Sequence, residues 1–378
     1  MPFDRGSFSM SMFKLTEDLP ENALELFDSN NAGKLDEVKD EPQLGWVSGR
    51  HLLERTIDEE TAILGGHLFL NLRTAQRKIP SALLKAESRM EELAYIKATG
   101  NPDVPRKVKK EIKETIEEKR LPQMVPSISG IPVVIDQTDN TLYLGATSVN
   151  QIDTFLGIFN DTLKVAPIQM NAEELMFEQK IDPKQYTGIS FKDSTDQDYY
   201  PGRDFLTWLW YFSEEKEGEV EVKNYGKFAV MIDGPLSFCA DGDGALESVM
   251  RKGNPLRSAE ARAALSVGKK LKKAKLIFAR EGETWTAIFD ADNFTFSSVI
   301  LPEGEEMEYV SRFAERINNT HIFKCIFKSF YAYFINEVNS ENWKNEVDKF
   351  RKWVVACTPP QAAKQLEYQE YHQSNFCR

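Results

Sequence analysis

The stretch KIPSALLKAESRMEELAYIKATGNPDVPRKVKKEIKETIEEKRLPQMVP, residues 78–126, decides how the rest of the chain is organised. Pro80 is compatible with a helix start, because the first N–H groups of a helix have no intrahelical acceptor. The apolar residues that follow recur at near-helical spacing among charged ones, at Leu83, Leu84, Met90 and Leu93. Gly100-Asn101-Pro102 then interrupts the pattern, and a second helix is predicted from about Val104 to Lys119.

The second helix has a narrow apolar stripe. Val108, Ile112 and Ile116 recur every four residues. The bases that surround the stripe are Lys107, Lys109, Lys110, Lys113, Lys119 and Arg120. So narrow a stripe suits two helices that pack on each other and project from a sheet. We therefore predict a helical hairpin over 78–122, while a solvated helix pair with no special role remains an alternative.

Length and composition bound the class of protein. A chain of 378 residues, 41% of them hydrophobic, is long enough for two or three domains with cores of their own. No apolar run reaches the length of a membrane span, and the first fifteen residues lack the layout of a signal peptide. The four cysteines are scattered without a Cys-x-x-Cys pair, which favours a reducing compartment over a disulfide scaffold or a zinc site. We expect a cytoplasmic protein without a membrane partner.

Charge is segregated along the chain. The net charge is −12, which alone argues against a nucleic-acid partner. Between Val249 and Arg280, however, ten bases face the single acid Glu260, so this basic window carries +9 and the remainder −21. Because binding follows the local potential, such a window predicts a DNA-binding surface. A basic strand and helix neutralised by acidic neighbours is the alternative.

The pattern of elements predicts an α+β fold made of two antiparallel-sheet and helix units, with the hairpin inserted between strands of the first. Strands are expected at 7–15, 61–73, 131–136 and 141–145, and helices at 21–29 and 149–163. We divide the chain into an N-terminal α+β domain (1–177), a C-terminal α+β domain with the basic window (178–338) and a helical tail (339–378).

The second half contains the most aromatic run, residues 204–212. It could stack on bases, but no base other than Arg203 interleaves with it, so a buried helix is favoured. Strands are predicted at 219–222, 227–232, 271–279 and 284–290, and helices at 258–267, 306–317, 322–338 and 341–356.

Motifs of enzymes and cofactor proteins are missing from the sequence. There is neither a phosphate-binding Gly-x-x-x-x-Gly-Lys-Ser/Thr loop nor a Gly-x-Gly-x-x-Gly, and the four histidines have no metal-ligand spacing. We predict no cofactor, metal or catalytic residue. Glu219, Glu221 and Lys223 nevertheless resemble the acid-x-Lys arrangement of some Mg²⁺-dependent nucleases, and a nuclease stays open as one alternative. A protein–protein adaptor that uses the aromatic run is the other.

Several short motifs in a fixed order resemble the RdgC family of recombination-associated proteins. These are Leu44-Gly45-Trp46-Val47, Lys78-Ile79-Pro80, Leu121-Pro122, Ile131–Asp136 with Thr141–Leu144, Lys164–Ile168, Arg251-Lys252 and Ala263–Lys273. The resemblance covers about 8–170 and 251–338, while 178–246 is longer than in compact members and the end of the chain is additional. It implies a nucleoid-associated protein that binds DNA without sequence specificity, favours duplexes, and closes around them as a ring-shaped homodimer. It also implies opposition to a RecA-type recombinase.

Combined with the charge pattern, the resemblance makes the bases of the window and the hairpin the candidate DNA contacts. They are Arg251, Lys252, Arg257, Lys269, Lys270, Lys273, Lys275, Lys107, Lys110 and Lys113. Strand alternation places Lys273 and Lys275 on one face and Lys272 on the other. Members of the family can carry an aromatic residue after the Leu-Pro of the hairpin exit, where this chain has Met124-Val125.

Overall fold

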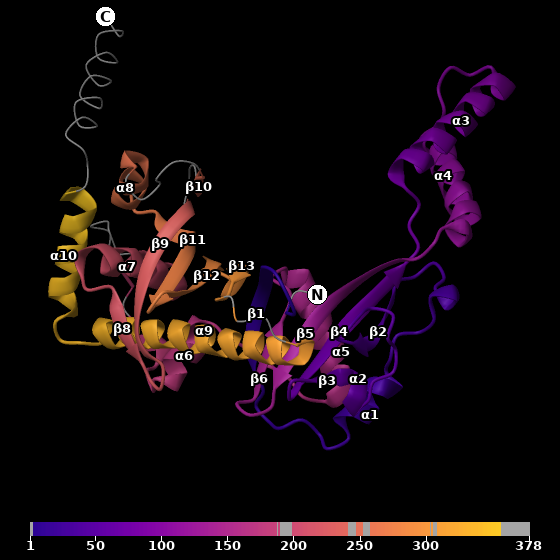
Figure 1. Ribbon diagram of the computed structural model, residues 1–378. Helices are drawn as coiled ribbons and strands as arrows, with labels where there is room; N and C mark the ends of the chain where they lie inside the picture. Colours follow the sequence, from indigo (N-terminus) through magenta and orange to yellow (C-terminus); the bar gives the residue numbers. More distant parts are fainter. Residues whose placement is uncertain are drawn as a thin grey trace, which may run out of the picture. The chain divides into compact units, whose positions relative to one another are not determined.

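The computed structural model describes residues 3–186, 188–189, 199–240, 247–251, 258–302, 304 and 308–356. The chain forms two compact units (Figure 1). Apart from Met1, unit 1 comprises Leu15–Leu142 and Asn150–Ala166, and unit 2 comprises Pro2–Lys14, Tyr143–Val149 and Pro167–Arg378. Both contain helices and antiparallel strands, which confirms the α+β class. The domain limits predicted from sequence remain a prediction.

The sheet of unit 1 is built around a long central strand, β4 (His67–Gln76). It pairs antiparallel with β2 (Gln43–Ser48) on one side and with β5 (Ser127–Asp136) on the other. The short β3 (Ile63–Leu64) also pairs with β4, and β6 (Thr141–Leu144) follows β5 in the strand order. The strands expected near 61–73, 131–136 and 141–145 are thus confirmed, and β5 begins four residues earlier than expected.

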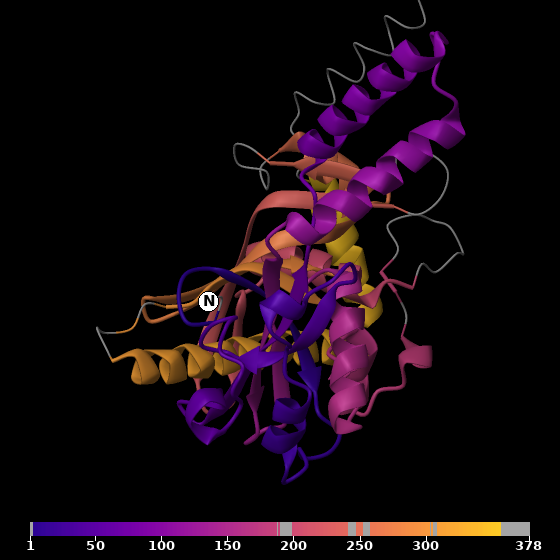
Figure 2. The ribbon, with the colours of Figure 1, turned by 90° about the vertical axis from the view of Figure 1, so that its right-hand side faces the viewer.

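The predicted helical hairpin is present between β4 and β5. It consists of α3 (Ser81–Thr99) and α4 (Arg106–Arg120), which lie side by side beyond the ends of the two strands (Figures 1 and 2). Pro80 and Pro105 are the N-cap residues, as expected of proline beside a helix start. Gly100 ends α3 with a φ of 71°, a left-handed conformation that glycine adopts without a steric penalty.

The core of unit 1 is aromatic. Trp46 on β2 is fully buried and packs edge-to-face on Phe27 and Phe155, with ring centroids 4.8 and 5.8 Å apart. Its indole N–H donates to the Thr162 hydroxyl at 2.9 Å. These contacts hold α1 (Ala23–Ser29) and α5 (Val149–Leu163) on the sheet. The remaining elements of the unit are η1 (Leu35–Glu37), α2 (Glu59–Ala62) and η2 (Leu121–Gln123).

Unit 2 has an antiparallel sheet in the order β10-β9-β11-β12-β13-β1. Its strands are β1 (Phe8–Lys14), β9 (Gly226–Cys239), β10 (Glu247–Met250), β11 (Lys270–Arg280), β12 (Glu283–Asp290) and β13 (Thr295–Ile300). The short β7 (Ile168–Gln169) pairs with β1, and β8 (Glu219–Val222) pairs with β9. The basic strand expected at 271–279 is therefore the inner strand β11.

One face of this sheet packs on helices. The aromatic run lies in α7 (Pro201–Glu215), and each residue from Pro201 to Phe212 is buried, so the buried-helix interpretation is confirmed. The helices predicted at 306–317 and 322–338 form one continuous helix, α9 (Tyr309–Val338). The polar residues between them do not break it: Thr320 is fully buried, and its hydroxyl donates to the Arg316 carbonyl of the same helix at 2.8 Å. Core packing thus overrides their low helix propensity.

The other helical elements of unit 2 are α6 (Ala172–Glu178), η3 (Pro183–Gln185), α8 (Ala259–Ser266) and α10 (Trp343–Ala356). Arg262 on α8 is inserted between Trp210 on α7 and Trp353 on α10, with its guanidinium carbon 4.5 and 3.9 Å from the two ring centroids. This buried cation–π contact locks the three helices together. Among the described residues no helix has the length and apolarity needed to cross a membrane.

Candidate nucleic-acid interface

The candidate bases on α4 are highly exposed. The side chains of Lys107, Lys110 and Lys113 are 88%, 77% and 57% exposed. Each ammonium is 3.3–3.8 Å from the carboxylate four residues later in the same helix. Such exposed pairs are worth only about 0.3–0.5 kcal/mol. All three lysines are therefore available to turn toward a phosphate.

Further exposed bases surround these three, and they extend the candidate set. Residues 97–113, which form the distal part of the hairpin, contain six bases and the acids Asp103 and Glu111, so this segment carries +4. The six are Lys97, Arg106, Lys107, Lys109, Lys110 and Lys113, and every one is exposed. The run from Arg106 to Lys110 already signalled this cluster in the sequence.

The proximal part of the hairpin has a different character. Arg120 at the end of α4 grips the Glu87 carboxylate on α3 with two hydrogen bonds, the one from Nε measuring 3.0 Å. This contact lowers the pKa of Glu87 and raises that of Arg120. A groove of about 280 Å³ lies beside the pair, with Met90 and Ile112 among its lining residues. Residues 81–96 and 114–120 contain four bases and six acids and carry −2, so the excess positive charge of the two helices lies within residues 97–113.

Lys270 in the basic window lies in the core of unit 2 and not on its surface. It is 5% exposed, and its ammonium lies 2.7 Å from the fully buried Asp204 carboxylate on α7. The expectation that Lys270 contacts DNA is corrected accordingly: β11 begins at this residue with its side chain turned toward α7. Tyr186 donates a second hydrogen bond to Asp204, at 2.9 Å. Burial is the main cause that raises the pKa of Asp204, and Lys270 opposes it.

The other bases of the window that reach the surface have partners too. Lys269 donates to the Ser248 hydroxyl at 2.7 Å. Lys273 and Lys275 share the outward face of β11, as alternation predicted, but their ammonium groups lie 2.8 Å from Asp290 and 3.6 Å from Asp233. Arg251 is exposed just after β10. Lys252 and Arg257 lie outside the described residues.

Acids outside the window thus neutralise much of it. Arg262 pairs with Glu214, Lys272 lies 3.6 Å from Asp292, and Arg280 lies 2.6 Å from Glu283. The interpretation of the window as a basic strand balanced by acidic neighbours therefore holds for most of its described bases. Among the described candidates, Arg251, Lys269, Lys273 and Lys275 remain within reach of a ligand, and the hairpin lysines are more exposed than Lys273 and Lys275.

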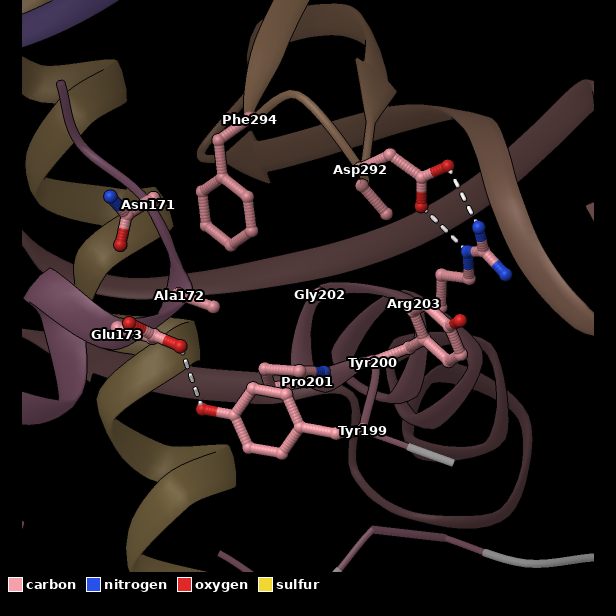
Figure 3. A pocket seen from close by; sticks show the side chains of 11 residues that line it. Asn171, Ala172, Glu173, Tyr199, Tyr200, Pro201, Gly202, Arg203, Asp292 and Phe294 are labelled. Atoms are coloured by element: carbon pink, nitrogen blue, oxygen red, sulfur yellow. Dashed lines mark hydrogen bonds and ion pairs between the residues drawn. The ribbon is translucent and has the colours of Figure 1, made fainter. Parts of the chain in front are cut away.

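A separate pocket of about 470 Å³ lies in unit 2, where α6, α7 and the turn after β12 meet (Figure 3). Asp292 holds Arg203 through two hydrogen bonds of 2.6 and 2.9 Å, and the guanidinium stacks over Tyr200. Tyr199 donates to Glu173 at 3.1 Å, and its pKa is raised to about 12, mainly by burial. Among the described residues that line the pocket Arg203 is the one arginine, and because it is already paired with Asp292 these residues offer no open anion site.

The structure also shows where the residues of the two alternative functions, the nuclease and the protein–protein adaptor, lie. Glu219 and Glu221 project outward from β8, while the alternating Val220 and Val222 are buried, and Lys223 is exposed after the strand. The pairing of Glu221 with Lys227 on β9 fits an ordinary exposed strand. The aromatic run proposed for an adaptor is buried in the core. No described contact brings either set together as a site.

Comparison with known proteins points to one family. Residues 9–181 match the family model described as "Putative exonuclease, RdgC". The chain is also 27% identical over 115 residues to the recombination-associated protein RdgC of Pseudoalteromonas atlantica. That alignment covers 30% of this chain and 38% of the relative's length. The matched region contains β2, β4, the hairpin, β5 and α5. Over residues 9–181, therefore, the chain is similar to the RdgC family.

Proposed function

We propose that the chain binds DNA without sequence preference, and that the distal part of the α3–α4 hairpin is its main contact. The observation that carries this proposal is the cluster of six exposed bases at residues 97–113 in a chain whose net charge is −12. Lysine and arginine side chains that neutralise phosphates release counterions, and this gain is independent of base sequence. Lys269, Lys273, Lys275 and Arg251 form a secondary contact.

The family match supports a role in recombination. The relative is named a recombination-associated protein, and we extend that role to this chain. The proposed form is a nucleoid-associated homodimer that encircles duplex DNA and modulates a RecA-type recombinase. The word exonuclease in the family description leaves a Mg²⁺-dependent nuclease as the competing function.

A gel-shift series on plasmid DNA between 50 and 200 mM salt tests the proposal. About five phosphate contacts per subunit give a log–log slope near −4.5, which is roughly a 500-fold loss of affinity over that range. Unrelated duplexes of equal length are expected to bind equally. A flat salt response, or binding confined to one sequence, would contradict the proposal. Mg²⁺-dependent degradation that Glu221→Ala abolishes would establish the nuclease instead.

Deleting residues 81–119 and joining the ends with a short turn tests the role of the hairpin in assembly. No residue of α3 is buried, and Ile116 is the single buried residue of α4, so unit 1 should keep its fold. We expect a folded monomer or open dimer, because a ring needs two contacts per subunit and a projecting hairpin suits one of them. Sedimentation and light scattering measure the mass. A deletion variant with the wild-type mass that still binds closed circular DNA would refute the hairpin contact.

A further inference from the structure

Arg77 stands at the neck of the hairpin, directly after β4 and before the Lys78-Ile79-Pro80 entry. Its Nε donates to the Val38 carbonyl at 2.7 Å. Its Nη1 donates to the Pro122 carbonyl at 3.3 Å and also to the Met124 carbonyl. One guanidinium therefore joins the strand that enters the hairpin, the segment that leaves it, and the loop after η1.

The loop that Arg77 reaches is itself well anchored. Val38 is 3% exposed. Arg55 donates to the Ala32 carbonyl at 2.6 Å, and the buried Arg73 donates to the carbonyls of Gly33 and Leu52. Three arginines thus hold the segment from Ala32 to Val38 through its main chain. A connection from Arg77 to this segment ties the neck to the body of unit 1.

Other restraints on the direction of the hairpin are few. The helices contribute one buried side chain, Ile116 on α4, and the β4–β5 ladder ends at the pair Gln76–Ser127. Arg120 binds α4 to α3 through Glu87, and it also donates to the Gln123 side chain in η2 at 3.1 Å. The two helices are thus held to each other, and they join the sheet at the neck between β4 and β5 (Figures 1 and 2).

We propose that Arg77 is a positioning residue that fixes the direction of the α3–α4 hairpin relative to the sheet of unit 1. The planar guanidinium directs several N–H groups at fixed angles, so it can hold three carbonyls at once. A lysine at the same place keeps the charge but lacks this fixed fork. The consequence for DNA rests on the proposed function, because a pre-oriented basic hairpin loses less freedom when it binds.

The test is a distance distribution between spin labels at Glu25 on α1 and Lys109 on α4, which are both exposed and both in unit 1. The four cysteines are replaced by alanine, and labelled chains are diluted with unlabelled ones so that distances within one chain dominate. We expect a narrow distribution in the parent chain, a broad one in Arg77→Ala and an intermediate one in Arg77→Lys. Arg89→Ala is the matched control, because Arg89 is exposed on α3 and pairs with Glu92, away from the neck.

DNA affinity is the second readout. Arg77→Lys is expected to lower it about fivefold with an unchanged salt slope, since the charge is kept and the pre-orientation is lost. A distribution that stays narrow in both Arg77 variants, with circular dichroism confirming their fold, would overturn the positioning role. A broadened distribution with unchanged affinity would support that role and instead refute the hairpin as the DNA contact. Should Arg77→Ala fail to fold, the same two outcomes are read from Arg77→Lys.

Discussion

Replacing Lys107, Lys110 and Lys113 together by Gln is expected to weaken DNA binding by on the order of a hundredfold at 0.1 M salt and to flatten the salt slope by up to about 2.7. The reason is the loss of three phosphate contacts from the most exposed of the described candidate lysines. The loss should be the same for every DNA sequence, because phosphates carry no base identity. Fluorescence anisotropy over a salt series measures both quantities, and the fold should survive since exposed charges contribute little stability.

Two further triple variants test whether the loss of DNA affinity is specific to the hairpin. Lys14, Lys34 and Lys39 are exposed and lie outside the candidate set, so their triple change to Gln lowers the charge equally and should leave binding close to that of the parent. The triple change of Lys269, Lys273 and Lys275 to Gln tests the secondary contact on β11. If the folded Lys107/Lys110/Lys113 variant keeps the parental salt dependence of affinity and the Lys269/Lys273/Lys275 variant loses it, the main DNA contact lies on β11 and not on the hairpin.

Replacing Lys270 by Met is expected to destabilise unit 2 by about 3–5 kcal/mol near neutral pH, because it leaves the buried Asp204 carboxylate without its cation. Denaturant unfolding followed by tryptophan fluorescence reports on this unit, since Trp208, Trp210, Trp285, Trp343 and Trp353 all lie in it and Trp46 alone lies in unit 1. A surface lysine at this position would produce almost no change on the same substitution.

The pH dependence of this loss follows from the raised pKa of Asp204. Burial is the largest cause and favours the neutral acid in the folded state. A carboxyl with a folded-state pKa above its unfolded value stabilises the fold below the unfolded pKa, and this stabilisation is lost as the pH rises through the folded pKa. Without Lys270 the pKa of Asp204 rises further. The penalty of Lys270→Met should therefore be largest at neutral pH and shrink as the solution is acidified.

The double variant Asp204→Asn with Lys270→Met supplies the control. An asparagine keeps an oxygen that accepts from the Tyr186 hydroxyl and the Ile189 N–H, but it carries no charge. Most of the lost stability should return, and its dependence on pH should disappear. A double variant as unstable as Lys270→Met alone would mean that lost packing, and not the uncompensated carboxylate, causes the destabilisation.

Local sequence was sufficient to predict the hairpin. Prolines before both helices, a glycine after the first and an apolar stripe four residues apart all act within one or two helical turns. The same holds for Glu219–Val222, where alternation of acids with valines gave the strand bounds that the structure has. For the aromatic run, the lack of interleaved bases indicated burial. The sequence also predicted that the lysines of α4 are exposed, because a surface helix buries only its apolar stripe.

Only the tertiary structure determines which bases of the window are exposed and which are buried or paired with acids. Ten bases in 32 residues appear alike in the sequence, yet Lys270 enters the core beside Asp204, 66 residues away, and Arg262 lies between two tryptophans. Burial and ion pairing depend on acids and rings that distant segments bring to β11 and α8, and no local pattern records those partners. The net charge of a segment is fixed by its sequence, whereas the charge that it shows to a ligand is fixed by the side chains that fold against it.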